Sequence, residues 1–562
     1  MEASEHARRS GSRPASRRRT PTAFRICDGV TEGLLYFQAV FAPWAFGTTE
    51  RWSIWTMNAA GYGLGGLLLA KGWIRWRSGY RPMRWGEAEE VSSAENQAGG
   101  MDSGPEGEGA VKQSPRLRRY HVRARAGSGS RLLAAALATL TVAILGYCLV
   151  SAVNARSTFI PEQMAFVPHD YVAWLPHSYD SSASWQAFWT YLGLALTYWA
   201  ARDWLLGKTA GERRDMRGEG REARGDASAR PPGAGPVDFP ARLQRLLWLL
   251  CLNGALLSLE GILQRLSGTD KLLWLVQPYW NQAGDLQFGP YAYRSNAAEY
   301  LNLLWPVCLG FWWTLRRAHR RAARAMGGAG RRVGSGPHVV LLPCAVLSAA
   351  APIISASRGG AIVAVAGMLV ALVLLLKAQR RGGGWMLLGV MVLFAAALLL
   401  AGRFGWEKLE PRLKTIFSDE MSGRVEIYRN AEQMARDFPV FGTGPGTFAQ
   451  VYHLYRAEAR ATWAAYAHND WLETRITFGW VGFVMILASL GIVLARSFGG
   501  GGIGVDRFFV FMTWLALAGC LVHARFDFPF QIYSTLGLFV EICAVLFCVS
   551  RGDSSGVDGV KV

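Results

Sequence analysis

Twelve apolar stretches, each about as long as a bilayer-crossing helix, constrain this chain more than any other feature of its sequence. A transmembrane helix needs about 20 mostly apolar residues, and the stretches occupy 29–47, 53–73, 132–153, 185–206, 245–266, 297–315, 337–354, 361–377, 384–402, 472–495, 508–523 and 533–550. A helix satisfies its own backbone hydrogen bonds inside a membrane. The sequence therefore predicts an all-α, polytopic transmembrane helical bundle of about 12 spans.

Composition excludes an ordinary soluble enzyme. Hydrophobic residues make up 51% of the 562 residues and charged residues only 18%, whereas charged residues are about a quarter of a soluble domain. The net charge of +19 would suggest nucleic acid in a soluble chain. In a membrane chain the basic residues instead indicate orientation, and no nucleic-acid partner is expected.

The basic residues lie mostly on one side of the expected bundle. With the N-terminus inside, the inner segments hold 43 of the 60 Lys and Arg residues, as the positive-inside rule requires. No small-residue cleavage site follows the first apolar run, so we expect a retained tail. We therefore expect a basic cytoplasmic tail at 1–27, a transmembrane domain at 28–550, a large outer loop at 403–471 and a cytoplasmic tail at 551–562.

The outer loop is expected to fold. Residues 424–436 place apolar side chains along one helical face, and a Gly-rich sequence at 442–446 follows. We interpret that sequence as a tight turn rather than a phosphate-binding loop, because a helix precedes it and Pro445 removes one amide. Residues 448–466 carry aromatic side chains and suggest a second helix.

Residues 467–470, with the sequence Ala-His-Asn-Asp, lie where the loop re-enters the membrane. The imidazole of His468 can act as a general base or as a hydrogen-bond donor near neutral pH. Alternatively, Asn469 or Asp470 caps the following helix and His468 is merely solvated. The sequence alone leaves both interpretations open.

Two arginines lie at the same outer boundary. Arg358 follows Ser355 and Ser357 between two apolar helices, and Arg294 precedes a helix that Ser295 or Asn296 could cap. A charge at membrane depth normally has a partner. Each arginine therefore either helps to form an anion pocket or extends to the lipid headgroups.

Neither a metal nor a cofactor is expected. The cysteines form no CxxC pair, and no two histidines are spaced as helical metal ligands. No nucleotide is available outside the membrane to drive synthesis, so an activated group must arrive on a carrier. A diphosphate-linked lipid is such a carrier, and arginines can bind its diphosphate without Mg²⁺.

Several motifs resemble, in chain order, the O-antigen ligase/polymerase superfamily of bacterial envelope glycan enzymes. They are the sequences that begin at Arg294, Ser355, Arg424 and Phe438, the sequence His468-Asn469-x9-Gly479-x-x-Gly482, and His523-Ala-Arg-Phe-Asp527. The resemblance covers about 290–535. The residue after Gly482 is Phe483, where many ligases have a small or polar residue.

The resemblance implies transfer of a glycan from undecaprenyl diphosphate to an acceptor hydroxyl at the periplasmic face of the bacterial inner membrane. Arg294 and Arg358 would hold the diphosphate, and His468 would activate the acceptor or orient the carrier. Asn469, Arg424 and Asp527 are further candidates for substrate binding. The expected partners are the carrier-linked glycan donor, a lipid or glycan acceptor and membrane lipids.

Two alternatives to a ligase remain at this stage. A polymerase of the same superfamily would use another carrier-linked repeat as acceptor. A transporter is the candidate from another functional class, because Glu260 and Glu541 lie within apolar spans and intramembrane acids are candidate ion sites. No internal repeat supports that alternative.

Overall fold

The computed structural model describes residues 20–86, 115–217, 239–325, 336–378, 384–414, 419–456, 464–499 and 503–551. Most of the expected N-terminal tail (1–19) and nearly all of the C-terminal tail (552–562) lie outside these ranges. The expected N-terminal tail is helical from Thr22, where α1 begins.

A helix forms most of each of the twelve apolar stretches. The helices are α1 (Thr22–Trp44), α2 (Arg51–Ser78), α3 (Pro115–Val153), α4 (Ser181–Leu206), α7 (Ala241–Ser267), α8 (Arg294–Ala325), α9 (Leu341–Ile354), α10 (Arg358–Ala378), α11 (Gly384–Lys414), α14 (Asp470–Phe498), α15 (Arg507–His523) and α16 (Tyr533–Cys548). Among the described residues, six helices are long and apolar enough to cross a membrane, and α15 and α16 are shorter apolar helices. The chain is an all-α polytopic membrane protein.

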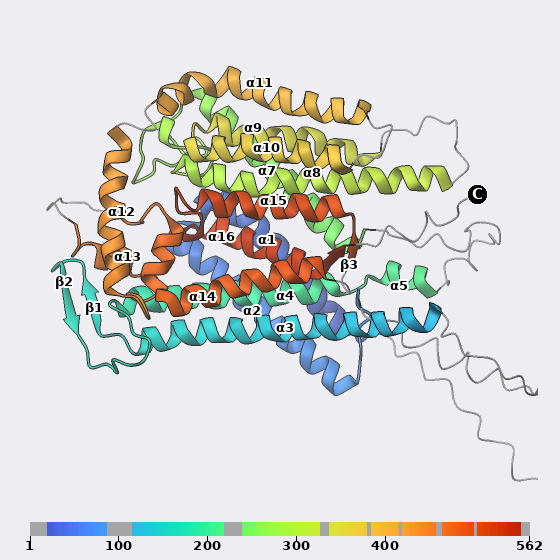
Figure 1. The fold of residues 1–562 in the computed structure, drawn as a ribbon, viewed down its shortest axis with the longest axis horizontal. Helices are drawn as coiled ribbons and strands as arrows, with labels where there is room; N and C mark the ends of the chain where they lie inside the picture. The colour runs from blue at the N-terminus through green and yellow to red at the C-terminus, as the bar shows by residue number, and fades with distance from the viewer. Residues whose placement is uncertain are drawn as a thin grey trace, which may run out of the picture.

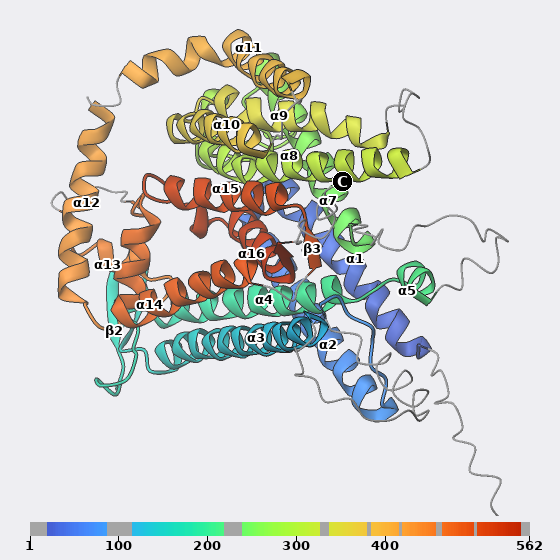
Figure 2. The ribbon, with the colours of Figure 1, turned by 45° about the vertical axis from the view of Figure 1, so that its right-hand side comes forward.

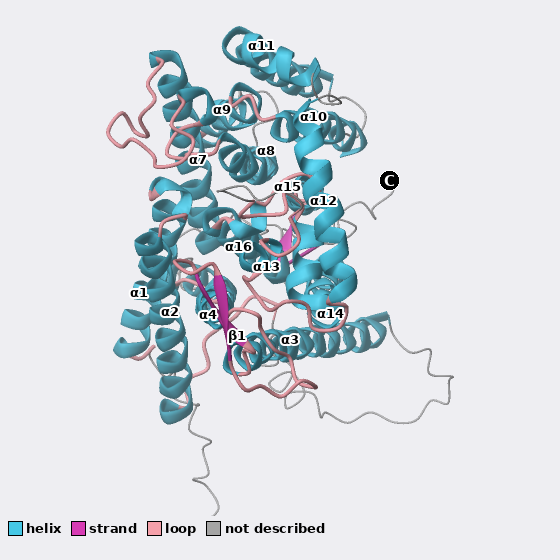
Figure 3. Cartoon of the chain, turned by 90° about the vertical axis from the view of Figure 1, so that its left-hand side faces the viewer, coloured by secondary structure: helices cyan, strands magenta, loops and turns pink. Residues whose placement is uncertain are grey.

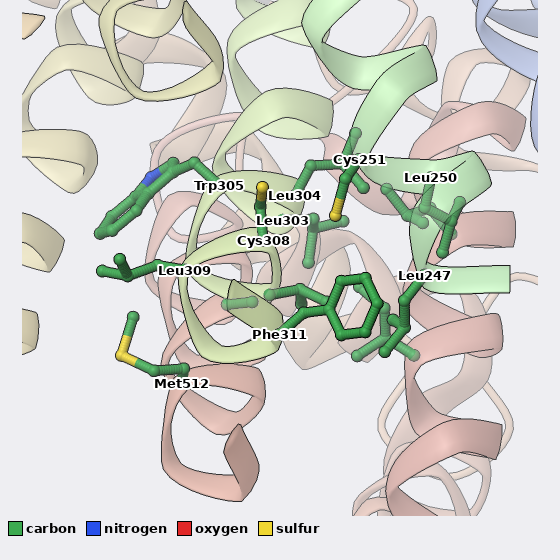
Figure 4. Packing of buried hydrophobic residues seen from close by; sticks show 14 of the residues in the cluster. Leu247, Leu250, Cys251, Leu303, Leu304, Trp305, Cys308, Leu309, Phe311 and Met512 are labelled. Carbon is green, nitrogen blue, oxygen red and sulfur yellow. The ribbon is translucent and has the colours of Figure 1, made fainter. Parts of the chain in front are cut away.

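The long helices run alongside one another in a bundle (Figure 1). Helix α8 lies inside the bundle and packs against α7, α9, α10 and α15, which Figure 2 shows from a second direction. Its side chains Trp305, Cys308 and Phe311 are buried together with Cys251 of α7 and Met512 of α15 (Figure 4). A helix that is apolar around its whole circumference is buried in this way.

Short elements gather at the two ends of the bundle. One end carries η1 (Phe46–Thr48), the antiparallel hairpin of β1 (Ser157–Ile160) and β2 (Ala165–Pro168), η2 (Gly284–Leu286), α12 (Asp419–Asp437), α13 (Phe448–Tyr452) and η4 (Pro529–Gln531). Figure 3 faces this end, with β1, α12 and α13 toward the viewer. The opposite end carries α5 (Ala210–Arg217), η3 (Pro337–Val340) and the parallel pair of β3 (Ile503–Val505) and β4 (Val549–Arg551).

The region expected as the outer loop differs from the sequence prediction in two respects. Helix α11 does not end at residue 402 but continues to Lys414, so the first part of 403–471 is helical. The expected helix at 448–466 is wrong as a single element, because α13 ends at Tyr452 and residues 453–456 and 464–469 are not helical. The helix expected at 424–436 is confirmed within α12.

The Gly-rich turn packs against a break in α14. Gly442, Gly444 and Gly446 all have positive φ, which confirms the tight turn. Within α14, Gly479 has φ 59° and ψ −168°, a conformation almost restricted to glycine. The amides of Thr443 and Gly444 donate to carbonyls of α14, and the amide of Trp480 donates to the carbonyl of Pro439. The loop and the broken helix thereby complete each other's backbone hydrogen bonds.

Candidate functional site

His468 occupies a strained position directly before α14. Its φ is +51°, a value that a residue with a Cβ rarely adopts. The carbonyl of His468 accepts a hydrogen bond from the hydroxyl of Tyr428 on α12 (2.9 Å). Ahead of it, the amide of Ala467 donates to the carboxylate of Glu473 (2.7 Å). These contacts from two helices hold the backbone in this conformation.

Asn469 is the N-cap of α14. Its side-chain oxygen accepts a hydrogen bond from the amide of Leu472 (3.3 Å), as an N-cap asparagine does. The side chain is buried. The cap and the histidine, which the sequence left as alternatives, are therefore adjacent features of one helix start.

The imidazole of His468 contacts Asp527, which lies between α15 and η4. Its Nδ1 is 3.1 Å from Oδ1 of the carboxyl group, and the side chains of His468 and Asp527 are 26% and 6% exposed. The other oxygen of Asp527 accepts hydrogen bonds from the hydroxyls of Ser295 (2.6 Å) and Tyr293 (3.3 Å). Asp527 therefore joins the loop before α14 to the start of α8.

The surroundings of Asp527 favour its ionised form. Burial alone would raise the pKa of its carboxyl, but the hydrogen bond and electrostatic interaction with His468 and the positive charge of Arg424 lower that pKa below its ordinary value of 3.8. An ionised carboxylate only accepts hydrogen bonds, so Nδ1 of His468 carries the proton. Nε2 is then the basic nitrogen of the ring.

The three candidate arginines lie around this pair in different ways. Arg424 of α12 donates to the carbonyl of Phe526 (2.8 Å), next to Asp527. Arg294, at the start of α8, instead contacts Asp285, with a hydrogen bond to its carbonyl and a distance of 3.7 Å to its carboxylate. The structure thus brings Arg424, His468 and Asp527 together and turns Arg294 toward a surface carboxylate.

Arg358 begins α10 directly after Ser357. The hydroxyl of Ser357 is 3.0 Å from that of Ser295, which itself donates to Asp527. Ala356 has φ +57°, and a guanidinium nitrogen of Arg265 donates to the carbonyl of Ser355 (2.9 Å). A chain of hydrogen bonds therefore links the segment before Arg358 to His468.

An aromatic cluster covers one side of His468. The ring of Phe528 stacks on Tyr466 (4.4 Å between centroids) and on Tyr293 (5.5 Å). The imidazole meets the same phenyl ring edge to face at 4.9 Å. These rings restrict water around His468 and fix the plane of its imidazole.

One group of possible metal ligands lies beneath the site. Ligand atoms of Glu299, His523 and Asp527 are within 4.8 Å of one another, the one such group among the described residues. Both oxygens of Asp527 already accept hydrogen bonds. Nε2 of His523 lies 3.7 Å from Oε1 of Glu299.

An apolar cavity of about 320 Å³ reaches the start of α14 from inside the bundle. Side chains of α3, α4, α14 and α16 line it, including Leu194, Phe478, Leu490 and Val540. Its polar lining includes Asp470, Glu473 and Gln531. The cavity therefore joins a hydrocarbon-like interior to the polar segment that carries His468.

Sequence reasoning missed several members of this network. The sequence suggests only a helix cap for Ser295 and only a place beside an arginine for Ser357, and it assigns no role to Tyr293, Arg265 or Asp285. A hydroxyl near a helix start is common, and nothing in the sequence shows which distant residue it will meet. The signal available in the sequence is position: Tyr293, Ser295 and Ser357 are each next to an assigned arginine, and Arg265 lies at the end of an apolar stretch, whereas Asp285 has no such signal.

Comparison with known proteins adds one finding. Residues 343–487 match the family model described as O-antigen ligase, and a search of curated proteins found no match. The matched segment contains Arg358, Arg424, His468 and Asn469, and Arg294 and Asp527 lie on either side of it. Together with the all-α membrane fold, this match supports the resemblance of the chain to the O-antigen ligase/polymerase superfamily.

Proposed function

We propose that this protein transfers a glycan from undecaprenyl diphosphate to an acceptor hydroxyl at the periplasmic face of the bacterial inner membrane. The observation that carries the proposal is the contact between Nδ1 of His468 and Asp527. It leaves Nε2 as a base on a partly exposed ring, within a segment that matches the O-antigen ligase family.

In the proposed reaction, Nε2 of His468 accepts the proton of the acceptor hydroxyl. The hydroxyl oxygen forms a bond to the anomeric carbon of the donor sugar, and the bond from that carbon to the diphosphate oxygen breaks. The electron pair leaves on the diphosphate. Asp527 orients the imidazole and stabilises its positive charge.

The arginines are proposed to hold the diphosphate. A guanidinium can donate two parallel hydrogen bonds to phosphate oxygens and stabilise a leaving anion. Arg424 donates to the carbonyl of Phe526 beside Asp527, and Arg358 directly follows Ser357, whose hydroxyl contacts Ser295. Arg294 would leave Asp285 and bind the substrate instead. Asn469 sets the start of α14, and its amide nitrogen would contact the donor. No metal takes part in this proposal, because Asp527 is already engaged by His468 and Ser295.

The apolar cavity supports a lipid-linked substrate. Its walls are mainly aliphatic and aromatic, so a hydrocarbon chain can move there from the bilayer without losing apolar surroundings. We propose that it receives a lipid chain of the donor or the acceptor. The diphosphate would then lie at the polar segment that carries His468.

The proposed orientation places both termini in the cytoplasm. The C-terminal parts of α2, α4 and α8 carry arginines (for example Arg75, Arg202 and Arg317) and lie opposite the His468 site, which is the distribution expected for a cytoplasmic face. In a Cys27→Ser background, Glu432→Cys on α12 should react with a membrane-impermeant thiol reagent before the inner membrane is lysed. Labelling only after lysis would reverse the orientation.

The glycans of a deletion strain of the source bacterium test the reaction. Loss of long polymer from its lipid anchor, with carrier-linked polymer accumulating, is expected for a ligase. Accumulation of single carrier-linked repeats would assign the same site to a polymerase. An unchanged glycan profile would contradict both.

A further inference from the structure

A cationic pocket lies at the end of the bundle opposite His468. The start of α1, the end of α2 with its following loop, the end of α4, helix α5 and the start of α7 surround it. Its volume is about 40 Å³, and two acidic side chains, Asp28 and Asp203, line it together with six basic ones, Arg25, Arg75, Arg84, Lys208, Arg213 and Arg242.

The two carboxylates are already shared among several cations. Asp203 pairs with Lys71 (3.0 Å), Arg75 (2.8 Å) and Arg84. Asp28 pairs with Arg242 and lies 3.5 Å from Lys71, whose side chain is fully buried. Four basic side chains thus depend on two acids, and the local charge stays positive.

Further donors face the pocket without an acidic partner. Within the described residues, Arg213 contacts neutral oxygens: the hydroxyls of Thr20 (2.9 Å) and Tyr80 (3.2 Å) and the carbonyl of Thr209 (3.3 Å). The Nε atoms of Arg75 and Arg242 are buried, with no hydrogen-bond partner there. Buried donors of this kind favour an acceptor, and excess positive charge favours an anion.

Size and position restrict the anion. A cavity needs a volume of about 10–15 Å³ to hold one water molecule. The volume of this pocket is about 40 Å³, so it admits a group of a few heavy atoms and not a sugar chain. Trp73 and Trp76 of α2 are 56% and 81% exposed and Ile26 of α1 is 61% exposed, which is typical of a surface at the headgroup level of a bilayer.

We propose that this pocket binds the phosphate of an anionic phospholipid, with the acyl chains lying along the exposed apolar side chains of α1 and α2. Basic pockets between helices bind lipid headgroups in this manner. The bound phosphate would neutralise the excess charge and tie together α1, α2, α4, α5 and α7. The site is independent of glycan transfer at the other end of the molecule.

The test uses the purified full-length protein in neutral detergent, with the unfolding midpoint followed by tryptophan fluorescence. Dioleoylphosphatidylglycerol is titrated into the micelles, and dioleoylphosphatidylcholine and inorganic phosphate are titrated separately. The variants are Arg213→Gln and Arg25→Gln, both at the pocket. Arg81→Gln is the matched control, because Arg81 is exposed next to the pocket and does not line it.

Phosphatidylglycerol should raise the midpoint of the wild type and of Arg81→Gln, whereas phosphatidylcholine should not. Arg213→Gln and Arg25→Gln should each need about fivefold more phosphatidylglycerol for half-saturation. This is the loss of affinity expected when one contact between an arginine and a phosphate is removed. Should Arg213→Gln fail to fold, Arg25→Gln decides the question. An equal response in all variants, no response to phosphatidylglycerol, or an equal rise with inorganic phosphate would each overturn the proposal.

Discussion

The backbone at His468 and Ala356 shows how the site is held at the scale of single residues. Both residues have positive φ, and such conformations cost about 1–3 kcal/mol each and persist only where the surroundings fix them. One strained residue carries the imidazole, and the other lies two residues before Arg358. Two of the eight non-glycine residues with positive φ in the described part of the chain therefore lie at the points that set the base and one of the cations.

Arg358→Lys should retain only weak activity, because lysine keeps the charge but loses the planar fork that binds two phosphate oxygens. Removing a charge-assisted contact of this kind costs about 1.5–3 kcal/mol, or about 10–100-fold in rate. The measurement is the rate at which the purified variant and the wild type transfer glycan from a carrier-linked donor. The control is Arg429→Lys, an exposed position on α12. Equal activity of the two variants would leave Arg358 as a headgroup anchor.

The lowered pKa of Asp527 predicts how stability depends on pH. A carboxyl whose pKa is lower in the folded state adds stability above its unfolded pKa and loses it as the pH falls through the folded value. The difference in unfolding free energy between wild type and Asp527→Asn should be constant from pH 7 to about pH 5 and shrink below about pH 4. A difference that changes between pH 5 and 7 would contradict an ionised Asp527.

The sequence identified the charged residues of the site better than the neutral ones. Arg424, His468 and Asp527 do converge, since charge at a membrane boundary is rare enough to stand out. The partner of Arg294 in this structure, Asp285, could not be identified. It lies in η2, a single short turn between two long helices, and so short an element has no periodicity that fixes which residues meet.

At the scale of elements, the break in α14 positions the outer loop. A Cβ on Gly479 would lie 2.2 Å from the carbonyl oxygen of Val440, so only glycine allows the loop to dock there. The sequence shows Gly479 and Gly482 as part of the motif that begins at His468. It does not predict that Gly479 contacts the loop at Val440 and Gly442, because a glycine in an apolar stretch is compatible with a regular helix.

Gly479→Ala should lower the unfolding free energy by at least about 1–3 kcal/mol, the cost of its backbone conformation alone. Unfolding of the purified protein in detergent measures this. Gly491→Ala is the control on the same helix, because a Cβ there meets nothing within 4 Å and alanine favours a helix. Equal stability of the two variants would show that the contact between the loop and α14 is not essential.

For the whole molecule, the sequence predicted the twelve helices but not their neighbours. The period and length of an apolar stretch predict a helix. Neither says that α8 will contact α15, two hundred residues away in the sequence, because lipid-facing and buried apolar side chains look alike. Such contacts bring Glu299 next to His523, which sequence spacing could not show.

Metal removal tests whether the group of Glu299, His523 and Asp527 binds a metal that the reaction needs. If the arginines and His468 suffice, treatment with EDTA and dialysis should leave glycan transfer unchanged. The measurement is transfer by the reconstituted enzyme before and after treatment, with readdition of Mg²⁺, Mn²⁺ or Zn²⁺. Activity lost with EDTA and restored by a metal would assign Glu299, His523 and Asp527 as its ligands and contradict a metal-independent reaction.

The central claim is that His468 acts as a base that Asp527 orients, and single-turnover glycan transfer in proteoliposomes tests it most directly. With saturating carrier-linked donor, His468→Ala should lose about 10²–10⁴-fold in rate, and Asp527→Asn about 10–100-fold. Both variants should insert normally and bind the donor. Near-normal turnover by His468→Ala would contradict the account and leave His468 as a residue that only precedes a helix.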